Sequence, residues 1–85
     1  MGDTSSGADT RAAPTQTVRL QGYGNAPARQ ASNIRVGDTL MWNAGATSRV
    51  VGVRQAGSQL IMRLRGEDGV VRERRFGRNR LLAVR

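Results

Sequence analysis

The feature that most constrains the fold is a series of short apolar runs from Ala31 onward, in which apolar side chains recur at every second residue. Glycine-containing turns separate these runs at intervals of about 8 to 12 residues, a spacing typical of small β-sandwiches and barrels. No segment shows a sustained helical period. The sequence therefore predicts one small all-β domain over residues 31–85.

The N-terminal part of the chain differs in composition from this domain. Residues 1–16 are mainly Gly, Ser, Thr, Ala and Asp, with no large apolar residue after Met1. Such a segment buries too little to offset the entropy lost on ordering, so a disordered arm is predicted. Residues 17–30 are predicted to form an extended segment, with a short strand over residues 17–20, and a loop over residues 21–27, where glycines, an asparagine and a proline occur.

Two of the three aromatic residues have predicted places in the fold. Trp42 shares one face of the strand predicted over residues 39–43 with Leu40, so we expect it at the centre of the core and largely buried. Tyr23 either pins its loop to the domain or stacks on a ligand. We expect the former, because a lone aromatic side chain in a loop more often covers apolar surface.

Two further strands are predicted on either side of a hairpin. Residues 49–54 form a strand in which Val51 and Val53 share one face, and Gly52 is expected to mark a bulge or a sharp bend. Residues 81–84 form the closing strand. A strongly curved strand at Gly52 would help a small sheet to close into a barrel.

The hairpin itself is predicted over residues 60–76, with a glycine-containing turn between its strands. A two- or four-residue loop places Leu64 and Val71 on the core side. A three-residue loop would instead bury Arg72 and Arg74, which is costly in an uncharged core. We therefore predict the first register, which puts four arginines on one outer face: Arg63, Arg65, Arg72 and Arg74.

That register leaves one conflict in the second strand of the hairpin. Val71 and Phe76 have opposite parity, so a regular strand cannot point both inward. We expect a bulge near Arg74 and Arg75, or a strand end before Phe76. Like charges opposed across the two strands are destabilising, and an external anion bound between them would relieve this repulsion.

The segment Ile34-x-Val36-Gly37-Asp38-x-Leu40, the short curved strands and a one-turn helix expected over residues 78–80 resemble the SH3-like small β-barrels, including the KOW and Tudor-type modules. The resemblance covers residues 31–85. It implies a barrel of about five antiparallel strands that acts as a binding module, with ligands that range from RNA and DNA to peptides. Val-Gly-Asp before a strand also opens Hint-type domains, but their chemistry needs a catalytic His, and this chain has no His or Cys.

The charge of the chain points to an acidic partner. All 14 basic residues are arginine, the net charge is +8, and residues 29–85 hold 12 of the arginines against four carboxylates. The planar donor fork of arginine suits phosphate, base edges and aromatic faces. A GC-rich genome explains most of the lack of lysine, but it does not explain the size of the positive excess.

The side chains available for catalysis are few. Without Cys or His, disulfides, thiolate sites and the usual zinc, copper and non-haem iron sites are excluded. Glu67 and Asp68 are expected as solvated turn residues, Asp38 as a turn cap, and Glu73 as the partner of a neighbouring arginine. We predict a protein that is not an enzyme and has no cofactor or metal. With no signal-peptide or membrane-span pattern, we expect a cytoplasmic location or one inside a phage particle.

The predicted function is nucleic-acid binding, without sequence specificity and mainly through backbone phosphates, because aromatic residues for base stacking are scarce. The alternative is a protein-interaction, assembly or host-modulating role, in a protein that a phage could encode, with docking on an acidic protein surface. The sequence leaves DNA and RNA equally open. The predicted nucleic-acid-binding residues are Arg63, Arg65, Arg72, Arg74, Arg75, Arg78 and Arg80.

Overall fold

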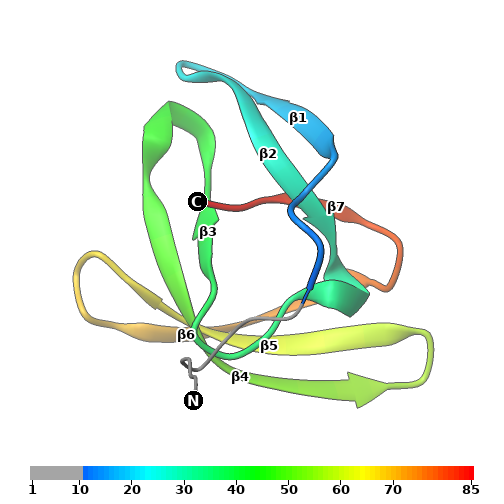
Figure 1. Cartoon of the computed structure of the whole chain (residues 1–85). Helices are drawn as coiled ribbons and strands as arrows, with labels where there is room; N and C mark the ends of the chain where they lie inside the picture. The colour runs from blue at the N-terminus through cyan, green and yellow to red at the C-terminus, as the bar shows by residue number, and fades with distance from the viewer. Residues whose placement is uncertain (1–10) are drawn as a thin grey trace, which may run out of the picture.

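Seven short strands make up most of residues 11–85, the part of the chain that the computed structural model describes. The strands are β1 (Gln16–Leu20), β2 (Gly24–Gln30), β3 (Thr39–Met41), β4 (Thr47–Ala56), β5 (Gln59–Gly66), β6 (Val71–Gly77) and β7 (Leu81–Ala83). They form two antiparallel sheets, β1-β2-β7 and β3-β4-β5-β6 (Figure 1). The protein is therefore all-β, as predicted, with seven strands rather than about five.

The four-stranded sheet is built from hairpins, and β4 bends at a bulge. The pairing of β4 with β5 shifts between Val50 and Gly52, which confirms the bulge predicted at Gly52. The extra residue reverses the parity of the strand, so that Val50, which is buried, and Val53 face the core. The prediction that Val51 and Val53 share the inner face is wrong for this reason.

The three-stranded sheet includes a strand that we did not predict. β2 begins at Gly24, so the loop predicted over residues 21–27 is confined to a turn at residues 21–23. The backbone of Pro27 faces Val84, beyond the end of β7, and its carbonyl oxygen accepts a hydrogen bond from the Val84 N–H (2.8 Å). Pro27 is tolerated within β2 because the N–H that it lacks would point to this side, where β7 has ended. The three-stranded sheet therefore includes β1 and β2, which precede residue 31, where the domain was predicted to begin.

The segment before β1 also packs on the domain. Residues 1–10 of the predicted arm lie outside the described residues. Arg11 donates hydrogen bonds to both carboxylate oxygens of Asp38 (2.7 and 2.8 Å) and to the carbonyl oxygen of Asn33. Arg29 donates to the carbonyl oxygen of Ala12 (2.9 Å). The prediction of a disordered arm is therefore wrong for residues 11–16.

The core lies between the two sheets, and Leu40 is at its centre with none of its surface exposed. Trp42 is only partly buried and packs against the edge of this core, where its Nε1 donates to the Ser48 Oγ (2.9 Å). The central position predicted for Trp42 is taken by aliphatic side chains. The buried residues of the main cluster are Ala31, Ile34, Leu40, Val50, Leu60, Met62, Leu64, Phe76, Leu82 and Val84.

The two sheets are joined at one side and open at the other. A single bridge between Leu40 and Val84 connects β3 to the chain after β7, and Figure 1 shows the C-terminal residues running to β3. β1 and β6 are the end strands, and each pairs on one side only within residues 11–85. The helical turn predicted before β7 is instead a hydrogen-bonded turn from Gly77 to Arg80. The result is an open barrel.

Candidate functional site

The β5–β6 hairpin positions most of the predicted site residues. Beyond the last strand pair, Arg65 and Val71, the Gly66 N–H donates to the Val70 carbonyl oxygen (3.0 Å), so the loop that sets the register has three residues, 67–69. The register pairs Leu64 with Arg72 and Met62 with Arg74, so these arginines lie on the inner face of the sheet. The predicted register is therefore wrong, and so is the outer face of four arginines that it implied: Arg63, Arg65, Arg72 and Arg74.

Arg72 and Arg74 are exposed although they lie on the inner face. β6 is an end strand, so its inner face opens to solvent at these positions. Arg72 pairs with Asp68 (3.1 Å), and the Arg74 Cζ lies 5.3 Å from the ring centroid of Trp42 and 5.8 Å from that of Phe76. The burial cost that led us to reject this register does not arise, because both guanidinium groups remain solvated or lie against aromatic rings.

The parity conflict within β6 is settled without a bulge. The pairing of β5 with β6 continues without a shift from Val71 to Gly77. Phe76 faces the core and is buried, whereas Val71 lies on the outer face and is 37% exposed. The predicted bulge near Arg74 and Arg75 is wrong because Val71 does not belong to the core.

The outer face of the four-stranded sheet carries a different set of arginines. Arg49 on β4 and Arg65 on β5 lie directly opposite each other, and Arg63 lies against Gly52. Arg54 and Arg75 lie on either side of Ile61, which is buried beneath this face. We call the following set the outer arginine face: Arg49, Arg54, Arg63, Arg65 and Arg75.

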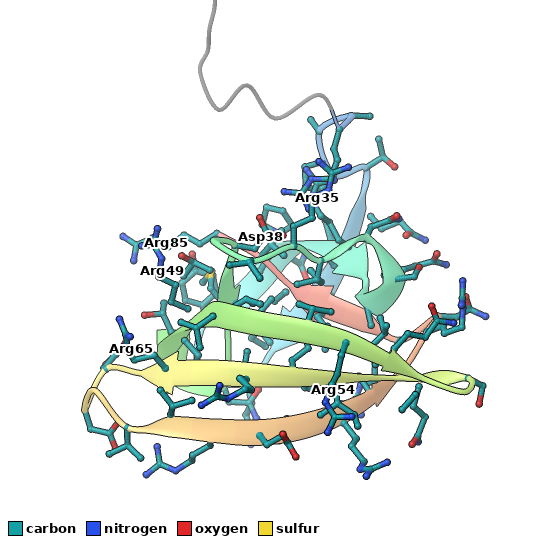
Figure 2. All side chains as sticks on the ribbon, turned by 90° about the horizontal axis from the view of Figure 1, so that it is seen from below. Arg35, Asp38, Arg49, Arg54, Arg65 and Arg85 are labelled. Atoms are coloured by element: carbon teal, nitrogen blue, oxygen red, sulfur yellow. The ribbon has the colours of Figure 1, made fainter. Side chains whose placement is uncertain are left out.

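One end of this face is extended by the C-terminal residue. Arg85 donates its backbone N–H to the carbonyl oxygen of Thr39 (3.0 Å), and Thr39 is the partner of Arg49 on β3. Figure 2, which views the molecule from below, shows Arg85, Arg49 and Arg65 gathered at the same end. These three side chains line a hollow of about 270 Å³, and Glu67 lines it as well. No Asp or Glu of residues 11–85 lies within 4.0 Å of their guanidinium nitrogens.

The remaining predicted site residues lie in the turn after β6. Arg80 extends over Phe76, with its Cζ 5.9 Å from the ring centroid, and Arg78 donates its backbone N–H to the carbonyl oxygen of Ser58 (3.3 Å). Both side chains are exposed. The structure thus divides the seven predicted residues among three places: the outer arginine face, the inner side of β6 and this turn.

The sequence analysis missed Arg49, Arg54 and Arg85 as site residues. Arg49 and Arg54 have opposite parity in the sequence, but the bulge between them turns both to the outer face. The signal that could have found them is therefore Gly52, which the sequence does show. Arg85 gave no such signal, because its place depends on a hydrogen bond to β3.

The four described carboxylates all have partners. Glu67 accepts hydrogen bonds from the Thr47 N–H (2.9 Å) and Oγ1 (3.1 Å), and Glu73 lies 3.9 Å from Arg54. Hydrogen bonds from Arg72 and from the Val70 N–H lower the pKa of Asp68. Residues 11–85 contain no group of three or more acidic side chains that could hold a metal ion.

Asp38 closes the turn before β3 and holds Arg11. Its Oδ2 accepts a hydrogen bond from the Arg35 N–H (2.8 Å), as expected for a turn cap. Burial alone would raise the pKa of Asp38, but the hydrogen bonds from Arg11 and Arg35 and the charges of Arg11 and Arg29 outweigh it. The pKa of Asp38 therefore lies below its ordinary value of 3.8.

Comparison of this chain with protein-family models, with curated proteins and with solved structures finds no match. Among the described residues, no helix has the length and apolar character needed to cross a membrane.

Proposed function

We propose that this protein is a small basic binding module that holds the phosphate backbone of DNA or RNA against its outer arginine face, without sequence specificity. The observation that carries the proposal is the pair of Arg49 and Arg65, which lie directly opposite each other with Arg85 beside them. Like charges placed in this way destabilise a sheet. A bound phosphate would remove that cost and accept hydrogen bonds from the planar guanidinium forks.

The balance of charge over the whole face supports the same ligand. The outer arginine face holds five arginines. Glu67 lines the hollow beside Arg49 and Arg65 without an ion pair to them, and Glu73, on the same face, pairs with Arg54. Both partners of that pair are more than half exposed, so it neutralises little of the face. A linear polyanion could contact several of these arginines at once, and each contact would release counterions from the nucleic acid.

The same surface offers little for reading base sequence. The described helices are two three-residue turns of 3₁₀ type, η1 (Ala31–Asn33) and η2 (Asn43–Gly45), and neither can act as a recognition helix. Trp42 and Phe76 lie on the inner side of the sheet, away from the outer arginine face. Tyr23 is 55% exposed but packs beside Gly45 at the turn between β1 and β2. The contacts would therefore fix position and not base identity.

The SH3-like relationship is part of this proposal. In its favour are the all-β open barrel and the turn over residues 34–38 that leads into β3. The turn in place of a helix before β7, and the additional strands β1 and β2, depart from the expected pattern. A module of this kind would act in the cytoplasm or inside a phage particle.

The test is titration of a short duplex DNA and of a single-stranded RNA with the protein at several salt concentrations. If about four to six arginines neutralise phosphates, log K should fall against log salt with a slope near −4 to −5 on duplex DNA. Replacing both Arg49 and Arg65 by Gln should make that slope shallower by roughly two units and weaken binding to all sequences alike.

The matched control is the double variant Arg19→Gln/Arg72→Gln, which removes the same charge from positions away from the outer arginine face. It should keep the slope of the parent to within about half a unit. If the two variants lose affinity equally, the effect is one of net charge and the assigned face is wrong. If the parent shows no binding at about 50 mM salt, the arginines serve an acidic protein partner instead.

A further inference from the structure

A groove lies on the side of the molecule where the barrel is open. It has a volume of about 590 Å³ and runs between β1 on one side and Trp42 and Arg74 on the other. Its floor is apolar, with Met41 and residues 81–83 at its base. Val18 and Leu20 of β1 pack against the small cluster beneath it and remain partly exposed.

One wall of this groove is the edge of β1 that pairs with no other strand of residues 11–85. The Pro27 carbonyl bonds to Val84, so the backbone of Pro27 faces β7, and the neighbouring residues of β2 face β1. In antiparallel pairing this makes Val18 and its alternate neighbours the β1 residues that bond to β2. The N–H and C=O groups of Thr17 and Arg19 therefore point to the open edge, where an added strand could bond to them.

The groove is also positively charged. Arg19, Arg74 and Arg80 all line it, and none of its lining residues is acidic. The Arg74 guanidinium lies over the Trp42 and Phe76 rings, which places its charge at the rim of the groove. An apolar floor beside fixed cations suits a ligand that alternates apolar and acidic groups.

We propose that this groove binds an extended acidic peptide segment of a partner protein, which adds as a strand along β1. The backbone of the segment would pair with Thr17 and Arg19, its inward side chains would cover the apolar floor, and its carboxylates would meet the arginines. This site shares no residue with the outer arginine face, so it is independent of the proposed nucleic-acid binding.

Two other occupants fit the groove less well. A single-stranded nucleic acid needs a free aromatic face for base stacking. Here the Arg74 guanidinium lies over the Trp42 ring, and the rings of Trp42 and Phe76 stack on each other, with centroids 6.3 Å apart and an interplanar angle of 18°. A second copy of this chain would bring together two molecules that each carry a net charge of +8. An acidic strand meets neither difficulty.

The test uses a synthetic peptide of about ten residues that alternates Val and Glu, the length of a strand that could span the groove. Trp42 is the chain's only tryptophan and lines the groove, so its fluorescence reports binding directly. Binding should shift the Trp42 emission and slow hydrogen exchange of the Thr17 and Arg19 amides. The double variant Arg74→Gln/Arg80→Gln should weaken binding roughly tenfold or more, as expected for the loss of two charge-assisted contacts.

Two controls separate strand addition from general charge attraction. The double variant Arg49→Gln/Arg65→Gln carries the same charge change on the opposite face and should bind the peptide as the parent does. A peptide N-methylated at alternate residues, which cannot complete the backbone pairing, should bind roughly tenfold more weakly or worse. Equal binding of the methylated peptide would overturn strand addition.

Two further outcomes would overturn the proposal. One is that oligothymidylate shifts the Trp42 emission in the parent while the peptide does not, which would assign the groove to nucleic acid. The other is that neither ligand alters Trp42 or the exchange of the β1 amides. Since duplex DNA binding is measured through Arg49 and Arg65, a failure at the groove leaves the proposed function untouched.

Discussion

Two groups of arginines on this small domain have opposite surroundings. Arg11 and Arg74 lie against partners within the fold: Arg11 binds both oxygens of Asp38 and has a side chain only 11% exposed, and Arg74 lies over two aromatic rings. Arg49 and Arg65 face each other across a strand pair, with no acidic partner in the described part of the chain. The same residue type thus stabilises the fold in one place and adds solvent-exposed positive charge without an ion pair in the other.

The sharpest test of this comparison is the substitution Arg11→Gln. It removes two charge-assisted hydrogen bonds and leaves the partly buried Asp38 carboxylate without its main partner, so the free energy of unfolding should fall by about 1.5 to 3 kcal/mol. Denaturant unfolding measures this, and Arg65→Gln is the matched control. Equal stability of the two variants would show that the segment before β1 contributes nothing to the fold.

The same ion pair predicts how stability depends on pH. Because the folded pKa of Asp38 is lowered, the stabilisation from its pair with Arg11 is fully present above about pH 5 and is lost as the pH falls through the folded value. Acid titration of the unfolding free energy should therefore show a steeper loss in the parent than in Arg11→Gln below about pH 4. Parallel curves for the two proteins would contradict a lowered Asp38 pKa.

A smaller effect is expected from Arg74→Gln, on the inner side of β6. Loss of the contact with the Trp42 and Phe76 rings should cost about 0.5 to 1 kcal/mol, the range for exposed cation–π pairs. The Trp42 emission should shift to the red, because the indole becomes more accessible to water. Arg75→Gln, one residue further along and on the outer face, should leave the spectrum unchanged; a shift there as well would argue against the assigned register.

The smallest effect, and the opposite sign, is expected on the outer arginine face. Arg49→Gln should leave stability unchanged or raise it by up to about 0.5 kcal/mol at low salt, because it relieves the repulsion from Arg65. The gain should shrink at about 1 M salt, where the Debye length falls to about 3 Å. A clear loss of stability would mean that Arg49 has a structural partner, and the contrast between the two groups of arginines would fail.

The register of the β5–β6 hairpin shows where inference from the sequence stopped. The sequence showed both strands and the alternation of Leu60, Met62 and Leu64, all of which are buried. It could not show that β6 is an end strand, and the rule against buried charge then favoured the wrong loop length. A shift of one residue exchanges the faces of a whole strand, so this single error moved Arg72 and Arg74 together.

A second error also arose because the sequence does not show which distant parts of the chain lie together. The N-terminal segment was predicted to be disordered because residues 1–16 contain almost no apolar side chains. That argument counts burial and leaves out ion pairs between distant residues. Arg11 is held by Asp38, 27 positions away, and the local composition of neither segment indicates their contact.

The sequence by itself determined the all-β class, the bulge at Gly52, the closing strand before the C-terminus and the large positive charge. These follow from local properties: the period of apolar residues, the freedom of glycine and the count of ionisable groups. The tertiary structure decided which arginines share a face, which of them have partners, and that β1 and β6 leave a groove between them. Those features depend on which strands lie at the ends of the sheets, and that order is set by contacts between residues far apart in the chain.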